Sequence, residues 1–135
     1  MQPHMKAKNR VPRPTRPLTA TELEMMHVIW RLGPCTVSQI RDTLLPQREL
    51  AYTSISTIVR ILEQKGFVKS DKVGRGHQYS ATMSKEEYQD LSLEHLVNKV
   101  FDDTPSLLVH RLLDSGRLTE KEITEIRALL RKKGN

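Results

Sequence analysis

The stretch AYTSISTIVRILEQKGFVKSDKVGRGHQYSAT, residues 51–82, decides the fold of this chain of 135 residues. Its pattern predicts a helix that ends at a Lys-Gly pair, then a strand, a tight basic turn and a second strand. The polar face of the helix carries small hydroxyl side chains and one arginine. The turn holds Lys72, Gly74, Arg75 and Gly76. This order is typical of a winged helix-turn-helix, a domain that binds duplex DNA.

Hydrophobic spacing defines the buried face of this helix, because apolar residues recur at i, i+3, i+4 and i+7. They are Ile55, Ile58, Val59 and Leu62. Gly66 follows where a helix commonly ends in the left-handed conformation. We expect strands at residues 67–70 and 77–80, and Gly74 and Gly76 permit the positive φ angles of a tight turn between them.

Two further helices are predicted ahead of this stretch. The first begins near Thr19 or Thr21, because Thr19 and Glu22 have the spacing of a capping box. The second begins close behind it, with Thr36 or Ser38 as its N-cap. The chain is therefore expected to be mainly α-helical with one small β-hairpin.

Helical spacing returns after the hairpin and predicts three short helices. Capping boxes at Ser84 with Glu87 and at Thr119 with Glu122 mark two of their starts. A segment of about 50 residues is marginal as an independent domain, and these helices have no evident core of their own. Pairing with a second copy is the simplest way to bury their apolar stripes. The expected dimer contacts are Leu96, Val100, Phe101, Leu108, Leu112, Ile123, Ile126 and Leu130.

The residue types in the helix and hairpin suit DNA recognition. A helix in the major groove meets base edges near its N-terminus, where hydroxyl side chains can donate hydrogen bonds and allow close approach. Arg60 can bind phosphate or guanine, and Lys69, Lys72 and Arg75 would hold the hairpin along the phosphate backbone. The candidate DNA-binding residues are Tyr52, Thr53, Ser54, Ser56, Thr57, Arg60, Lys72, Arg75 and His77.

Charge is distributed unevenly along the chain, whose net charge is +6. The first 20 residues contain five basic side chains, four prolines and no acidic side chain. Such a segment cannot bury a core, so we expect residues 1–18 to be a disordered or extended arm. It is either a solvated tail or an arm that follows DNA. Residues 83–135 are nearly neutral, as an oligomerisation region could be.

Several classes of protein are not supported by the sequence. No apolar run approaches the roughly 20 residues of a membrane helix, and no signal peptide is visible. With Cys35 as the only cysteine, we expect a cytoplasmic protein without membrane insertion. The five histidines lack the spacing of metal ligands, and common catalytic motifs are missing. We therefore expect no metal, no cofactor and no enzymatic activity.

Three segments make the chain similar to a known family. They are LTATELEMMHVIWRLGPCTVSQI from residue 18, AYTSISTIVRILEQKGFVKSDKVGRGHQYSA from residue 51, and SLLVHRLLDSGRLTEKEITEIRALLRKK from residue 106. In this order they resemble the penicillinase-repressor family, which includes the BlaI, MecI and CopY regulators. The resemblance implies a winged helix, a three-helix dimerisation region, and a homodimer that represses transcription from a dyad-symmetric operator.

Two departures from that family concern how repression ends. Copper-responsive members carry a C-terminal cysteine cluster, which this chain lacks. Staphylococcal members are cut by a membrane-bound sensor protease at an Asn-Phe bond, and the matching place here is His110-Arg111. The resemblance thus gives His110 and Arg111 as the candidate cleavage site, with a sensor protease as a candidate partner.

The sequence predicts three regions: an arm at residues 1–18, a winged helix-turn-helix at 19–82 and a helical dimerisation region at 83–135. The leading hypothesis is a dimeric transcriptional repressor. A winged-helix regulator released by a small ligand is one alternative, and a winged-helix protein-interaction module is another. A basic hairpin and a hydroxyl-rich third helix favour DNA over protein docking.

Overall fold

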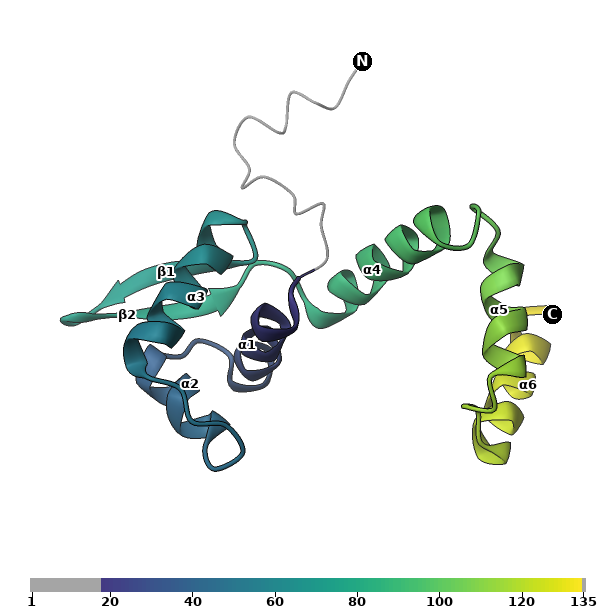
Figure 1. The fold of residues 1–135 in the computed structure, drawn as a ribbon, viewed down its shortest axis with the longest axis horizontal. Helices are drawn as coiled ribbons and strands as arrows, with labels where there is room; N and C mark the ends of the chain where they lie inside the picture. The colour runs from purple at the N-terminus through teal and green to yellow at the C-terminus, as the bar shows by residue number, and fades with distance from the viewer. Residues whose placement is uncertain (1–17, 135) are drawn as a thin grey trace, which may run out of the picture. The chain divides into compact units, whose positions relative to one another are not determined.

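The computed structural model describes residues 18–134 of the chain (Figure 1). The elements in chain order are α1 (Ala20–Leu32), α2 (Val37–Leu44), α3 (Tyr52–Gln64), β1 (Val68–Val73), β2 (Gly76–Ala81), α4 (Lys85–Lys99), α5 (Pro105–Asp114) and α6 (Glu120–Gly134). A mainly helical fold with one β-hairpin confirms the predicted class. Apart from Leu18, the arm predicted at residues 1–18 lies outside the described residues.

The chain forms two compact units, the first ending at Ser92 and the second beginning at Leu93. The first contains α1, α2, α3, the hairpin and the first half of α4, which the sequence analysis assigned to the C-terminal region. None of the helices within residues 18–134 is long and apolar enough to cross a membrane. The same residues include no group of three or more side chains placed to hold a metal ion.

Side-chain caps set the starts of α1 and α2. The Glu22 N–H donates to Thr19 Oγ1 at 3.2 Å, and the Thr19 N–H donates to Glu22 Oε1 at 3.0 Å, which confirms the predicted capping box. At the start of α2, Thr36 rather than Ser38 is the cap. Its hydroxyl accepts the Gln39 N–H at 3.1 Å, and Gln39 Oε1 accepts the Thr36 N–H at 2.8 Å.

The end of α3 turns the chain sharply into β1. Gly66 has φ +88°, the left-handed conformation predicted for it. The Gly66 N–H donates to the Glu63 carbonyl at 3.0 Å, and the Phe67 N–H donates to the Leu62 carbonyl at 2.9 Å. This pair of hydrogen bonds is a Schellman motif, which satisfies carbonyls that the helix leaves free. Phe67 is 1% exposed and enters the core directly after the turn.

The hairpin is longer than predicted, with Val68 paired to Ala81 at its base and Val73 paired to Gly76 at its tip. The two-residue loop consists of Gly74 and Arg75. Gly74 has φ +61°, as expected for the first position of a tight hairpin turn. Gly76 does not use this freedom, because it is part of the paired strand β2.

Cys35 extends the hairpin with one more antiparallel bridge. Its N–H donates to the Tyr79 carbonyl at 3.0 Å, and the Tyr79 N–H donates to the Cys35 carbonyl at 2.7 Å. The side chain of Cys35 is buried, and burial raises the pKa of its thiol. Cys35 is therefore a neutral core residue that attaches the α1–α2 connection to β2.

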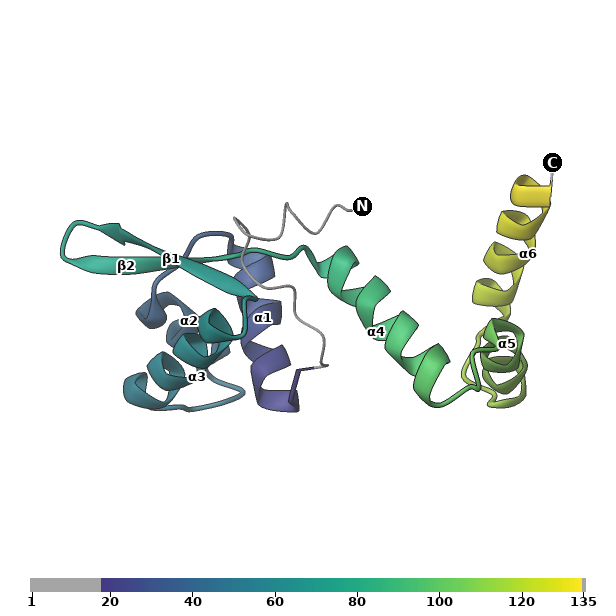
Figure 2. The same ribbon diagram turned by 90° about the horizontal axis from the view of Figure 1, so that it is seen from above.

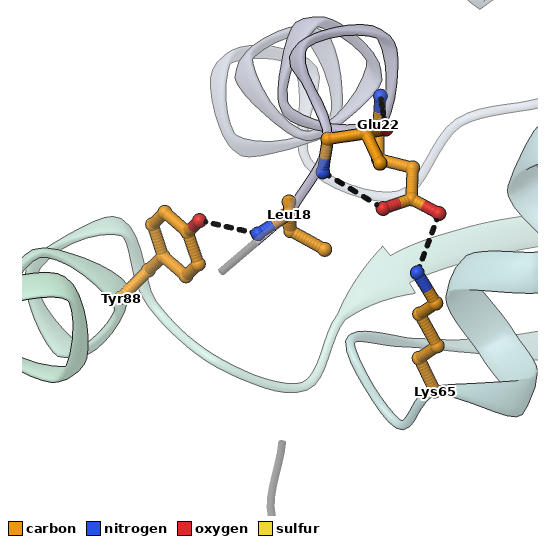
Figure 3. Close-up of polar contacts among 5 residues, drawn as sticks. Leu18, Glu22, Lys65 and Tyr88 are labelled. Carbon is orange, nitrogen blue, oxygen red and sulfur yellow. Dashed lines mark hydrogen bonds and ion pairs between the residues drawn. The ribbon is translucent and has the colours of Figure 1, made fainter. Parts of the chain in front are cut away.

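The first unit has one hydrophobic core, to which α1, α2, α3 and the hairpin all contribute. Its largest fully buried side chains are Phe67, Met25, Met26, Ile29, Ile40, Ile55, Leu62, Val59, Val68 and Cys35. Tyr88 adds α4 to this core, with its ring centroid 5.8 Å from that of Trp30 and 5.9 Å from that of Phe67. The Leu18 N–H donates to the Tyr88 hydroxyl at 2.8 Å (Figure 3).

The second unit consists of the rest of α4 with α5 and α6. Neither α5 nor α6 has a fully buried side chain. Several large apolar residues of this unit are well exposed: Leu93, Leu96, Val100, Val109, Leu112, Leu113, Leu129 and Leu130. Asp102 and Asp103, with φ 54° and 56°, separate α4 from α5.

One partly buried ion pair links the start of α1 to the end of α3. Glu22 is 7% exposed, and its Oε2 lies 2.7 Å from Lys65 Nζ (Figure 3). Burial alone would raise the pKa of Glu22, but the hydrogen bonds from Lys65 and Thr19 outweigh it and leave that pKa below its ordinary value. The carboxylate is therefore ionised in the folded protein at neutral pH.

This ion pair makes stability depend on pH. Because the folded pKa of Glu22 lies below the unfolded value of about 4.3, the pair stabilises the fold above that pH and loses its contribution as pH falls through the folded pKa. Between about pH 5 and pH 3, the free energy of unfolding should therefore fall more for wild type than for Glu22→Gln. Urea denaturation at a fixed protein concentration measures this difference. The exposed Glu86→Gln is the control and should keep the wild-type profile, whereas parallel profiles for wild type and Glu22→Gln would contradict the assignment.

Candidate nucleic-acid interface

The outward face of α3 is polar and open to solvent. Thr53, Thr57 and Arg60 lie nearly opposite the buried Ile55 and Val59, given about 100° of rotation per residue. Among the predicted contacts on this helix, the exposed side chains are Tyr52, Thr53, Ser54, Thr57 and Arg60, and the partly buried one is Ser56. Thr53, Ser54, Thr57 and Arg60 therefore share one accessible face of α3, whereas Tyr52 and Ser56 lie toward its margin.

Two side chains on this helix hydrogen bond within it. The Thr57 hydroxyl donates to the Thr53 carbonyl at 2.9 Å. Arg60 Nη2 donates to Ser56 Oγ at 3.5 Å, the long limit for such a bond. The sequence analysis treated the hydroxyls alike as donors to DNA, yet the structure directs that of Thr57 back to its own backbone.

The hairpin presents two faces, and one of them adjoins α3. Lys72 pairs with His77 and Ser70 pairs with Tyr79, so all four side chains lie on the same face of the hairpin. Ser70 Oγ donates to Glu63 Oε2 of α3 at 2.6 Å, which identifies this as the face next to the helix. The hairpin extends beyond the three helices (Figure 2). Lys72 and His77 form the pair before its tip, so they lie further out along that face than Ser70 and Tyr79.

Lys69 belongs to the opposite face of the hairpin. Successive side chains in a strand alternate, so Lys69 and Lys72 point away from each other. The sequence analysis grouped them as equivalent phosphate contacts, but only Lys72 shares the face that adjoins α3. Arg75 occupies the tip, next to the exposed Val73.

Tyr79 shows how closely α3 and the hairpin approach. Burial raises the pKa of Tyr79, the Glu63 carboxylate raises it further, and the Arg60 guanidinium acts in the opposite direction. Arg60 lies three residues before Glu63, whose carboxylate accepts the hydrogen bond from Ser70, so Arg60 is on the side of α3 that adjoins the hairpin. Arg60 thus connects the outward face of α3 with the face that carries Lys72.

Ion pairing divides the cations of the first unit into two groups. Arg41 lies 3.7 Å from Asp42, and Arg48 lies 3.4 Å from Glu24. Lys65 is paired with Glu22, as described above. Across residues 18–134, no acidic side chain lies within ion-pairing distance of the cations that the sequence analysis assigned to DNA, Arg60, Lys72 and Arg75. Their charge remains available to an anionic partner.

Sequence reasoning missed three exposed residues around this surface. Ile61 is 37% exposed and Gln64 is also exposed, both on the outward side of α3, and Val73 is 52% exposed near the hairpin tip. Ile61 lies one helical turn beyond Thr57, and that i, i+4 spacing was the available signal. The core pattern of Ile55, Ile58, Val59 and Leu62 does not include Ile61, and its apolar side chain does not fit the polar pattern expected of DNA contacts.

All eight residues expected at a dimer contact fall in the second unit. Leu96, Val100, Leu112 and Leu130 are exposed, at 38%, 60%, 39% and 65%. The remaining four are partly buried: Phe101, Leu108, Ile123 and Ile126. The candidate cleavage residues His110 and Arg111 are also exposed, inside helix α5.

Comparison with known proteins gives concordant matches. The family model described as penicillinase repressor matches residues 18–132. The methicillin resistance regulatory protein MecI of Mammaliicoccus sciuri is 26% identical over 88% of this chain and 97% of its own. The penicillinase repressor of Bacillus licheniformis is 24% identical over 87% of this chain and 92% of its own. The solution structure of the DNA-binding domain of the repressor BlaI matches with a TM-score of 0.50 at 23% identity. The matched region covers 57% of this chain and 94% of that structure, and the match supports the winged-helix fold.

The two hairpin faces give a direct test of the interface. Lys72→Ala should weaken binding to random-sequence duplex DNA and lower the slope of log affinity against log salt by about one, because one phosphate contact is lost. Lys69→Ala removes the same charge from the same strand and should leave the slope unchanged. Fluorescence anisotropy over a range of salt concentrations measures both. Equal losses for the two variants would mean that the face adjoining α3 has no special part in binding.

Proposed function

Because the chain belongs to the penicillinase repressor family, whose members are transcriptional repressors and not enzymes, we propose that it represses transcription as a homodimer bound to a dyad-symmetric operator. Two of its relatives are named a methicillin resistance regulatory protein and a penicillinase repressor, and both names describe regulators. The operator, the dimer and the release step are our inferences for this chain.

The observation that carries the proposal is the continuous surface from α3 to the hairpin. Exposed hydroxyl residues on α3 are followed by Arg60 and then by Lys72 and Arg75, none of which is paired with a carboxylate among the described residues. A helix of this kind fits the major groove, and cations beside it can bind phosphates. Three unpaired cations beside a hydroxyl-rich helix favour a polyanionic partner such as duplex DNA.

Dimerisation follows from the exposed apolar side chains of the second unit. Large contiguous apolar patches on a protein surface mark interaction sites, and α5 and α6 have no buried side chain of their own. A second copy offers the same stripes and would bury both sets at once. Two linked winged helices would then bind two half-sites, so the affinity for a palindrome would exceed that for one half-site.

Selection from a random duplex pool with the full-length protein tests the whole proposal. We expect enrichment of one short motif repeated with two-fold symmetry. Half-sites one helical turn or a multiple of it apart would match a symmetric dimer. Recovery of no preferred sequence would contradict operator binding, and enrichment of a single asymmetric motif would contradict the dimeric arrangement.

Charge placed on the exposed leucines should separate dimerisation from DNA recognition. Leu112→Glu and Leu130→Glu should dissociate the dimer, because they put carboxylates into an apolar contact. In gel shifts they should weaken binding to the palindrome, while affinity for one half-site stays near that of wild type. Analytical ultracentrifugation reports the oligomeric state. Leu32→Glu, at a leucine of the first unit that is 41% exposed, is the control and should remain dimeric.

We also propose that repression ends when a membrane-bound sensor protease cuts between His110 and Arg111. These residues are in the middle of α5, so a cut would separate α6 and the last turn of α5 from the rest of the stripe. The helix would have to open locally before cleavage, since proteases bind extended chain.

A chain that ends at His110 reproduces the cut product and tests its consequence. It should sediment as a monomer and lose most of its preference for the palindrome over a single half-site. Its half-site affinity should stay close to that of the full chain, because α3 and the hairpin are unchanged. A dimeric product with full operator affinity would exclude cleavage at this position as the release step.

A further inference from the structure

The hydroxyl of Thr57 is hydrogen bonded within α3, which leaves the γ-methyl as the other branch of this exposed side chain. The side chain is exposed and lies near the middle of the outward face. Its hydroxyl donates to the Thr53 carbonyl at 2.9 Å, inside the helix. A threonine in a helix that bonds back to the i−4 carbonyl has used its only donor. The γ-methyl is the branch that remains free.

Ile61 extends this apolar character by one turn. It is 37% exposed and lies at i+4 from Thr57, so the two side chains are neighbours on the helix surface. The core already takes Ile55, Val59 and Leu62 from α3, all at 0% exposure, and does not enclose Ile61. The threonine methyl and the isoleucine therefore form an apolar spot on a face that is otherwise polar and cationic.

We infer that Thr57 and Ile61 read a thymine by contact with its C5-methyl group, on the premise of the proposed function that α3 enters the major groove. Thymine alone presents a methyl group in that groove, beside its O4 acceptor, and a threonine methyl is a suitable partner. The contact selects thymine over cytosine at one position of each half-site. Arg60 and the hairpin cations supply affinity that does not depend on this base.

The experiment starts from the palindrome that selection yields and removes thymine methyl groups one at a time. Replacing a thymine with deoxyuridine deletes only the methyl and keeps the base pair. At one position per half-site, wild-type affinity should fall about three- to fivefold, the effect expected for losing one buried methyl contact. Deoxyuridine at the other thymines should change little.

Two variants of Thr57 separate its methyl from its hydroxyl. Thr57→Val retains a methyl and removes the hydroxyl, and it should bind like wild type with the same loss on deoxyuridine. Thr57→Ser retains the hydroxyl and removes the methyl. It should bind thymine DNA about three- to fivefold more weakly and show no further loss on deoxyuridine. Ile61→Ala should reduce the ratio of thymine to deoxyuridine affinity.

Thr124→Ser is the matched control. Thr124 is exposed on α6, and its hydroxyl donates to the Glu120 carbonyl at 3.0 Å, the same arrangement as at Thr57. It should leave the affinity ratio at the wild-type value. Because the readout is a ratio between two DNAs, a small change in the fraction of folded protein cancels.

The outcomes distinguish this inference from the proposed function. Absence of any preferred sequence would overturn both. A selected palindrome on which Thr57→Val loses affinity while Thr57→Ser does not would overturn the methyl contact and assign the reading to the hydroxyl. If a palindrome is selected but wild type and Thr57→Ser show the same ratio of thymine to deoxyuridine affinity at every position, the inference is overturned and the proposed function is not.

Discussion

The reversal of the chain at Gly66 is the constraint on which the arrangement of the first unit depends. A left-handed residue ends α3 there, and the next residue, Phe67, enters the core. Lys65, the residue before Gly66, forms an ion pair with Glu22 at the start of α1. Thr82 closes the base of the hairpin through a hydrogen bond from its hydroxyl to the Gly66 carbonyl. Three segments of chain therefore meet at one turn, and the direction of the hairpin relative to α3 follows from it.

The two compact units differ in how they achieve stability. The first buries a continuous core of methionine, isoleucine and leucine around α3, whereas α5 and α6 bury no side chain fully. Hydrophobic burial is the main favourable term in folding, so the second unit gains most by contact with other apolar surface. In the proposed dimer, its folding would be coupled to association, and its stability would depend on protein concentration.

Local chemistry explains which features could be predicted from sequence. The capping boxes at Thr19, Ser84 and Thr119 involve residues three apart, and the structure contains all of them. Gly66 was equally predictable, because its position just beyond the last apolar residue of α3 calls for a left-handed conformation.

Long-range contacts and side-chain directions were not predictable in the same way. The bridge between Cys35 and Tyr79 joins residues far apart in sequence, and so does the bond from Leu18 to Tyr88. The separation of Lys69 from Lys72 could have been found from strand alternation, once the strand was known to be long enough to contain both. The hydroxyl of Thr57 has a choice between backbone and solvent, and no sequence pattern decides it.

Trp30 is the single tryptophan of the chain, and it is an intrinsic fluorescence probe of the contact between α1 and α4. Its indole N–H donates to the Met83 carbonyl at 2.9 Å, and its ring packs against Tyr88 of α4. Detachment of α4 from the first unit would break that hydrogen bond and expose the half-buried ring to water. The emission spectrum of the unlabelled protein therefore responds to the attachment of the first half of α4 to this core.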